Sequence, residues 1–294
     1  MAQFYKPSGR VSPGAPLVLV AAAAVSCALA PLYAAGTLYI PLVYLNVACL
    51  LFYAIVVGKA AGAAGRLTRT LNPPVTALLA VLGSWAGFCL SWSAWLGLIF
   101  FFQDVSFPGF GRLMEYLKTP EAWSYLALHP EDLYGFAKEV NGEGVWGLGR
   151  GHATPVKGTL LLLVWVAEFG IYSVVTAVKG AAAVAEPYSE EARGFLPELK
   201  VAGRGFAAPE DPQQRSALLG ALASGDLGYF NQAPPAEGGG PGLFLTFHTS
   251  DASSWGTVKV EEVTVAGKKQ NRKEVVKNLV VPLSYIHSLK ARLS

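Results

Sequence analysis

Glu168 is the residue whose position most needs a chemical explanation, because it lies inside the apolar stretch WVAEFGIYS, residues 165–173. It is the only carboxylate between Lys157 and Glu186. A charged side chain at mid-bilayer costs at least about 2.5–3.5 kcal/mol on insertion scales. If this stretch crosses a membrane, Glu168 must therefore face other helices or water rather than lipid.

Several polar side chains are candidate partners for Glu168. Tyr172 follows four residues later and shares its helical face. The other candidates belong to two further apolar stretches, and they are Tyr44, Asn46 and Ser91. Two interpretations stay open at this point. Glu168 either fixes helix packing through hydrogen bonds, or it binds a proton or a cation as a transporter or membrane-embedded enzyme would.

The elements that position these groups are four runs of apolar residues. A membrane-spanning helix needs about 20 apolar residues. The chain is 52% hydrophobic and only 15% charged, whereas soluble domains carry about 25% charged residues. Gly83, Gly87 and Ser91 form a stripe of small residues that would let another helix approach closely. The sequence thus predicts a bundle of four transmembrane helices, at residues 17–35, 39–58, 75–102 and 158–178, with a turn between the first two near Gly36-Thr37.

The orientation of the spans follows from Lys and Arg near their ends. Segment 103–157, between the third and fourth spans, has five basic and seven acidic residues. We therefore expect a multi-pass protein of the bacterial inner membrane, with both termini in the cytoplasm and segment 103–157 outside. The basic residues near the cytoplasmic ends are Lys6, Arg10, Lys59, Arg66, Arg69 and Lys179.

Two domains are expected, a four-span domain at residues 1–178 and a cytoplasmic domain at 179–294, with a linker at 179–187. Within segment 103–157, the stretches GFGRLMEYLKTPEAWSYLAL and HPEDLYGFAKEVN predict two interfacial helices. The tail predicts a small α+β domain built on an antiparallel β-meander. It has a helix at about 212–224 with Asp211 as its N-cap, three strands, a β-bulge at Glu261-Glu262 and a closing helix.

Two stretches of the tail, PYSEEARGF and HTSDASSWG, each place small residues three apart. A zinc ribbon has Cys-x2-Cys at paired turns of this kind. The frame is that of a degenerate ribbon whose ligand positions are Ser189, Ala192, Ser250 and Ser253, although coincidence would produce the same pattern. The cysteines, Cys27, Cys49 and Cys89, all precede the tail, so we expect no bound metal and no cofactor.

Taken together, the stretches IPLVYLN, VWVAEFGIYS and FHTSDASSWGTVKV resemble a family of bacterial four-span membrane proteins. Members of that family have a cytoplasmic tail with paired cysteines at the corresponding turns. The resemblance covers most of the chain and implies the same architecture, but it brings no activity. The chain departs from the family's pattern at the four ribbon positions, which puts an inherited metal role in doubt.

These observations favour some classes of function over others. The net charge of +3 and the lack of a basic stripe interleaved with aromatic residues argue against a nucleic-acid binder. The sequence contains no P-loop, kinase or hydrolase motif. We therefore expect a non-enzymatic membrane protein. Its expected partners are the lipid bilayer, a cytoplasmic protein that docks on the tail and, if the protein is a homo-oligomer, further copies of the chain. A transporter or membrane-embedded enzyme that uses Glu168 is the alternative.

Overall fold

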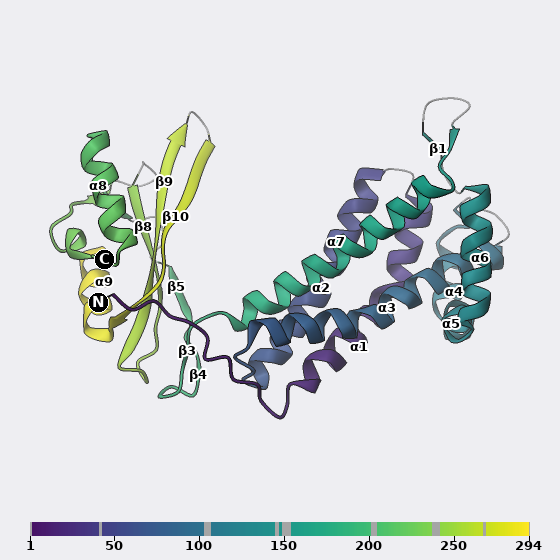
Figure 1. The fold of residues 1–294 in the computed structure, drawn as a ribbon, viewed down its shortest axis with the longest axis horizontal. Coiled ribbons are helices and arrows are strands. Elements are labelled where there is room, and N and C mark those ends of the chain that lie inside the picture. Colours follow the sequence, from purple (N-terminus) through teal and green to yellow (C-terminus); the bar gives the residue numbers. More distant parts are fainter. Residues whose placement is uncertain are drawn as a thin grey trace. The chain divides into compact units, whose positions relative to one another are not determined.

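The computed structural model of the protein describes residues 2–40, 43–102, 107–144, 147–148, 154–200, 205–236, 242–266 and 269–293. The chain divides into a helical unit, Ser8–Ala185, and a sheet unit, Met1–Pro7 with Glu186–Ser294 (Figure 1). This division differs from the expected domains in two respects. The last long helix continues past residue 178, and the first seven residues belong to the sheet unit.

The helical unit is built on four long helices, each apolar and long enough to cross a membrane, as the sequence predicts. They are α1 (Pro16–Tyr39), α2 (Val43–Leu67), α3 (Pro73–Phe102) and α7 (Thr159–Val184). The turn expected near Gly36-Thr37 is wrong, because both residues lie inside α1. Ile40 is the extended residue that ends the helix, and it precedes Pro41, a position that disfavours helical backbone.

Glycines lie at two contacts between the long helices, one between α1 and α3 and the other between α2 and α7. A Cβ added to Gly83 would lie 2.3 Å from the Leu19 carbonyl oxygen, and one added to Gly87 would lie 2.2 Å from Ser26 Oγ. The predicted stripe of α3 is therefore the place where α1 crosses. On the other side of the bundle, a Cβ on Gly62 of α2 would lie 2.5 Å from Ala183 Cβ of α7. Such contacts require glycine because any side chain would force the backbones apart.

Three short helices follow α3, where the sequence predicts two. The difference arises at Pro120, which does not merely interrupt a helix but begins the next one, as proline does at a first helical position. The helices α4, α5 and α6 gather at one end of the bundle (Figure 1). Tyr116 donates a hydrogen bond to the Ala94 carbonyl of α3 at 2.8 Å, and Ser93 Oγ accepts one from Ala127 N at 3.0 Å. These elements are α4 (Phe110–Leu117), α5 (Pro120–Leu128), α6 (Pro130–Glu143) and the short pair β1 (Gly147–Leu148) and β2 (Thr154–Pro155).

The sheet unit is an antiparallel sheet with helices on one side (Figure 1), which confirms the predicted α+β tail. The strands run in the order β10-β9-β8-β6-β7, and β5 also pairs with β8. Asp211 caps α8 by accepting a hydrogen bond from Gln213 N at 3.0 Å. The strands are β5 (Glu198–Lys200), β6 (Gly205–Phe206), β7 (Pro235–Ala236), β8 (Gly242–His248), β9 (Trp255–Ala266) and β10 (Lys269–Pro282), with β3 (Tyr188–Ser189) and β4 (Gly194–Phe195) as a separate hairpin. The helices are α8 (Pro212–Ala223), the 3-10 turn η1 (Gly228–Asn231) and α9 (Leu283–Leu293).

The β-bulge expected at Glu261-Glu262 is not on β9, whose pairing with β8 is continuous. The irregularities lie on the partner strand β10, between Glu274 and Val276 and between Val276 and Leu279. Glu262 keeps the regular alternation of β9 and pairs with Arg215 of α8 at 2.6 Å. The apparent shift in the valine pattern therefore reflects a partly buried ion pair rather than an extra residue.

The first residues of the chain extend this sheet at its β10 edge. Tyr5 N donates to the Asn278 carbonyl at 2.9 Å, and Val280 N donates to the Gln3 carbonyl at 2.8 Å. Asn278 has a positive φ of 48°, an uncommon conformation that asparagine tolerates better than most residues. It lies within the irregular part of β10, which thereby offers backbone groups to the N-terminal segment.

Candidate functional site

Glu168 lies in the first half of α7, and its side chain accepts a hydrogen bond from the hydroxyl of Tyr33 on α1. Glu168 is partly buried, and Tyr33 is only 9% exposed. The carboxyl thus points into the bundle, as the cost of lipid exposure requires. Its partner is on the first span, whereas the sequence suggested Tyr172 or a group of the second or third span.

Aromatic rings from all four long helices form a chain of contacts that begins at Tyr33. Tyr33 stacks on Tyr53 of α2 with ring centroids 5.0 Å apart, and Tyr53 lies 4.8 Å from Tyr172 of α7. Tyr172 in turn stacks on Phe88 of α3 at 5.2 Å. Offset and tilted aromatic pairs of this kind add about 0.5–1.5 kcal/mol each beyond the burial of area. We call Tyr33, Tyr53, Phe88, Glu168 and Tyr172 the tyrosine cluster.

The hydroxyl groups near Glu168 join the helices in pairs. Tyr53 donates to the Ser26 carbonyl of α1 at 2.8 Å, and Tyr172 donates to the Ser84 carbonyl of α3 at 3.4 Å. Thr176 of α7 donates to the Ala54 carbonyl of α2 at 3.3 Å. With the Tyr33–Glu168 bond, these contacts connect α1 with α7, α1 with α2, α3 with α7, and α2 with α7. The network therefore links every long helix to at least one other.

Of the polar residues named from the sequence, only Tyr172 joins Glu168 in the cluster. Tyr44 is 92% exposed and takes no part. Asn46 donates to the Thr37 carbonyl at 3.4 Å, and Ser91 donates to the carbonyl of Phe88 within its own helix at 2.7 Å. Sequence reasoning missed Tyr33 and Tyr53. The available signal was a tyrosine deep inside an apolar run, where its hydroxyl needs a partner because lipid offers none.

Two of the four positions predicted to be degenerate ribbon ligands, Ser189 and Ser253, meet in the sheet unit. Ser189 Oγ and Ser253 Oγ lie 3.0 Å apart, and both residues are buried. Ser189 Oγ also accepts a hydrogen bond from Ala192 N at 3.3 Å, and Ser253 N donates to the Ser250 carbonyl at 3.0 Å. The two turns therefore face each other through a serine pair. A hydroxyl pair fills the space between them but is a poor ligand set for zinc.

A second contact joins the same two turns. The Glu191 carboxylate accepts hydrogen bonds from Ser254 N at 2.6 Å and from Ser254 Oγ at 2.9 Å. These bonds favour the charged form and lower the pKa of Glu191. Across the part of the chain that the structure describes, no three His, Cys, Asp or Glu side chains are grouped so that they could hold a metal ion.

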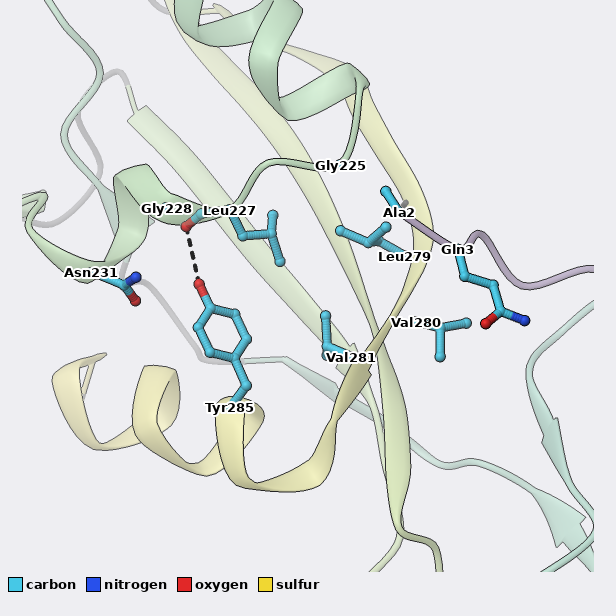
Figure 2. A pocket seen from close by; sticks show the side chains of 10 residues that line it. All are labelled: Ala2, Gln3, Gly225, Leu227, Gly228, Asn231, Leu279, Val280, Val281 and Tyr285. Atoms are coloured by element: carbon cyan, nitrogen blue, oxygen red, sulfur yellow. Dashed lines mark hydrogen bonds between the residues drawn. The ribbon is translucent and has the colours of Figure 1, made fainter.

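A shallow pocket of about 450 Å³ lies in the sheet unit between the N-terminal segment and β10 (Figure 2). Tyr285 closes one side, and its hydroxyl donates to the Leu227 carbonyl at 3.0 Å. The lining contains backbone, aliphatic and amide groups, but no charged side chain that could act as an acid or a base. It comprises Ala2, Gln3, Gly225, Leu227, Gly228, Asn231, Leu279, Val280, Val281 and Tyr285.

In comparisons with known proteins, no family model, no curated protein and no solved structure matches this chain.

Proposed function

We propose that the chain is a non-enzymatic integral membrane protein of the bacterial inner membrane, whose tail docks a cytoplasmic protein. In this proposal the four-span bundle is an anchor, and Glu168 holds its helices together. The observation that carries it is the network of four hydrogen bonds between different pairs of helices. A carboxyl engaged by a neighbouring tyrosine within such a network is suited to fixing helix register.

The orientation is supported by charge and by strand pairing. No Asp or Glu occurs in residues 1–103, so the segments before the first span and between the second and third contain basic residues and no acidic ones. This pattern favours the cytoplasm for both segments. Residues 3–5 pair with β10, which requires the two termini to lie on one side of the membrane. An even number of spans meets that requirement.

The docking role is supported by an exposed stretch of the sheet edge. β10 is the terminal strand in the sheet order, the described residues of the N-terminal segment pair with it only at residues 278–280, and its residues 271–274 are all exposed. An exposed edge strand presents backbone groups to which an extended peptide can pair. A photo-cross-linking residue at Asn271 in the full chain should therefore give a discrete adduct in cells, while one at the exposed Ser288 of α9 should not. Equal adducts at both positions, or none at Asn271, would contradict docking at this edge.

Substitutions at Glu168 separate the packing role from the alternative. Glu168→Gln should be mild, because the amide oxygen still accepts the hydrogen bond from Tyr33. Glu168→Leu should cost about 1 kcal/mol, because the Tyr33 hydroxyl is left without an acceptor. Thermal unfolding in detergent measures both effects, and Tyr44→Phe, at an exposed hydroxyl, is the matched control.

The transporter or enzyme alternative predicts a different result. If Glu168 handles a proton or a cation, Glu168→Gln should abolish complementation of a deletion strain while its thermal stability stays near that of the unmodified chain. That combination would overturn the packing role. Equal complementation by Glu168→Gln and the unmodified chain, with a destabilised Glu168→Leu variant, supports it.

A further inference from the structure

Lys179 of α7 packs against α2 at Gly58, the residue before Lys59. A Cβ added to Gly58 would lie 2.7 Å from Lys179 Cβ and 2.8 Å from the Thr176 carbonyl oxygen. The two helix backbones are therefore in contact one residue before Lys59. Because Gly62 meets Ala183 further along, the helices run in the same direction, and both lysine stems start at the same level of the bundle.

Both lysine side chains are exposed, and the long helices carry no carboxylate near them. No acidic residue occurs on α1, α2 or α3. The one acidic residue of α7 is Glu168, which is eleven positions before Lys179, or about 16 Å along a helix axis, and it is engaged by Tyr33. Within the long helices the two ammonium groups therefore have no carboxylate close enough to neutralise them.

The level of this pair matches that of lipid headgroups. Residues 159–178 of α7 are free of basic residues and span about 30 Å, which is the thickness of the hydrocarbon layer. Lys179 is the next residue. Lysine stems lie along apolar surface and carry their ammonium groups to the interface. Both ammonium groups can thus reach the level of lipid phosphates, at the end of the bundle away from α4–α6.

We propose that Lys59 and Lys179 together bind the phosphate of an anionic phospholipid. Two ammonium groups on adjoining helices that carry no nearby carboxylate suit a phosphodiester whose headgroup carries no cation of its own. A zwitterionic lipid is a poorer ligand, because its own ammonium group competes for the phosphate and is repelled by the lysines. This inference rests on the proposed membrane embedding of the helical unit, but it does not depend on which way the chain is inserted.

The test uses the full chain in nanodiscs of phosphatidylcholine into which phosphatidylglycerol is introduced in steps. The unmodified protein should show a rise in melting temperature that saturates with the phosphatidylglycerol fraction. The apparent affinity should fall about fivefold for each of Lys59→Gln and Lys179→Gln. The double variant should lose the saturable rise. Lys157→Gln, at the other end of α7, is the matched control and should behave like the unmodified protein.

A further variant and further controls distinguish loss of lipid binding from other causes. The Lys59→Arg/Lys179→Arg variant keeps both charges and should retain the saturable rise, which separates loss of binding from loss of folding. Inorganic phosphate at the same concentration should give no rise. An equal rise with phosphate alone, an equal loss in Lys157→Gln, or a rise that is unchanged in the double glutamine variant would each overturn the proposal. Reporter fusions after Arg66 test the insertion direction separately, so failure of the orientation is distinguishable from failure of the lipid site.

Discussion

The helical unit and the sheet unit differ in how much of their packing is made by small residues. The fully buried positions of the long helices include six alanines, whereas the sheet unit buries phenylalanine, leucine and valine. The alanines are Ala22, Ala30, Ala54, Ala61, Ala80 and Ala94, and the sheet residues include Phe206, Phe230, Leu243, Phe247, Val258 and Val260. In water, burial of large apolar side chains drives folding. In lipid that driving force between helices is absent, so close backbone approach and hydrogen bonds take its place.

The contrast also shows where each unit places its polar groups. In the helical unit Tyr53 and Tyr172 bond to carbonyls of other helices and Tyr33 bonds to Glu168, so polar contacts lie within the helix packing. In the sheet unit the buried serine pair lies at two turns, outside the aliphatic core. Removing volume should therefore harm the sheet unit most, and adding volume should harm the helical unit most.

The largest effect is expected from removing volume in the sheet unit. Phe247→Ala deletes a fully buried ring from β8 and should cost about 3–5 kcal/mol. Proteolysis of the sheet unit in the full-length protein across a urea series measures the loss. Phe244→Ala on the same strand removes a ring that is only partly buried and should cost clearly less. Equal losses at the two positions would mean that the core does not lie where we describe it.

Adding volume in the helical unit should give the next largest effect. Gly87→Val places a side chain where a Cβ already lies 2.2 Å from Ser26 Oγ, and it should cost about 1–3 kcal/mol through overpacking. Gly170→Val on α7 is the control, because a Cβ there meets no other atom within 4 Å. Thermal unfolding in detergent compares the two variants. If Gly170→Val proved as destabilising as Gly87→Val, helix propensity rather than close approach would explain the loss.

The serine pair should give the smallest effect. Ser189→Ala leaves the buried Ser253 hydroxyl without this partner and should cost about 1 kcal/mol. The Ser189→Ala/Ser253→Ala variant should cost less than twice that amount, because the two residues share one contact. Ser288→Ala at an exposed position of α9 is the control. Additive losses in urea-dependent proteolysis would show that the two turns are not coupled through this pair.

Cysteines introduced at the four predicted ribbon positions would test the geometry of the two facing turns. If the facing turns have ribbon geometry, a chain with cysteine at Ser189, Ala192, Ser250 and Ser253 should bind about one zinc ion, which elemental analysis detects. Failure of a folded variant to bind zinc would favour coincidence over a degenerate ribbon.

The sequence predicts the four long helices and the strands because composition and period act locally. Asp211 could be assigned as an N-cap because its bond to Gln213 lies within three residues. The partner of Glu168 could not be assigned, because Tyr33 is on the helix farthest from it in sequence and residue spacing does not report which helices face each other. Tyr44 was a plausible partner by type, but it lies at the start of α2 and points outward. The position of the β-bulges was missed because the Arg215–Glu262 pair is a tertiary contact.

The pairing of residues 3–5 with β10 sets the order in which the protein can be assembled. The ribosome makes residues 3–5 before the four long helices and makes β10 after them. All four long helices must therefore be synthesised before residues 3–5 can take their place. During this time Phe4 and Tyr5 lack the strand that they pair with in the finished protein. Completion of this edge of the sheet thus reports that the whole helical unit has been made.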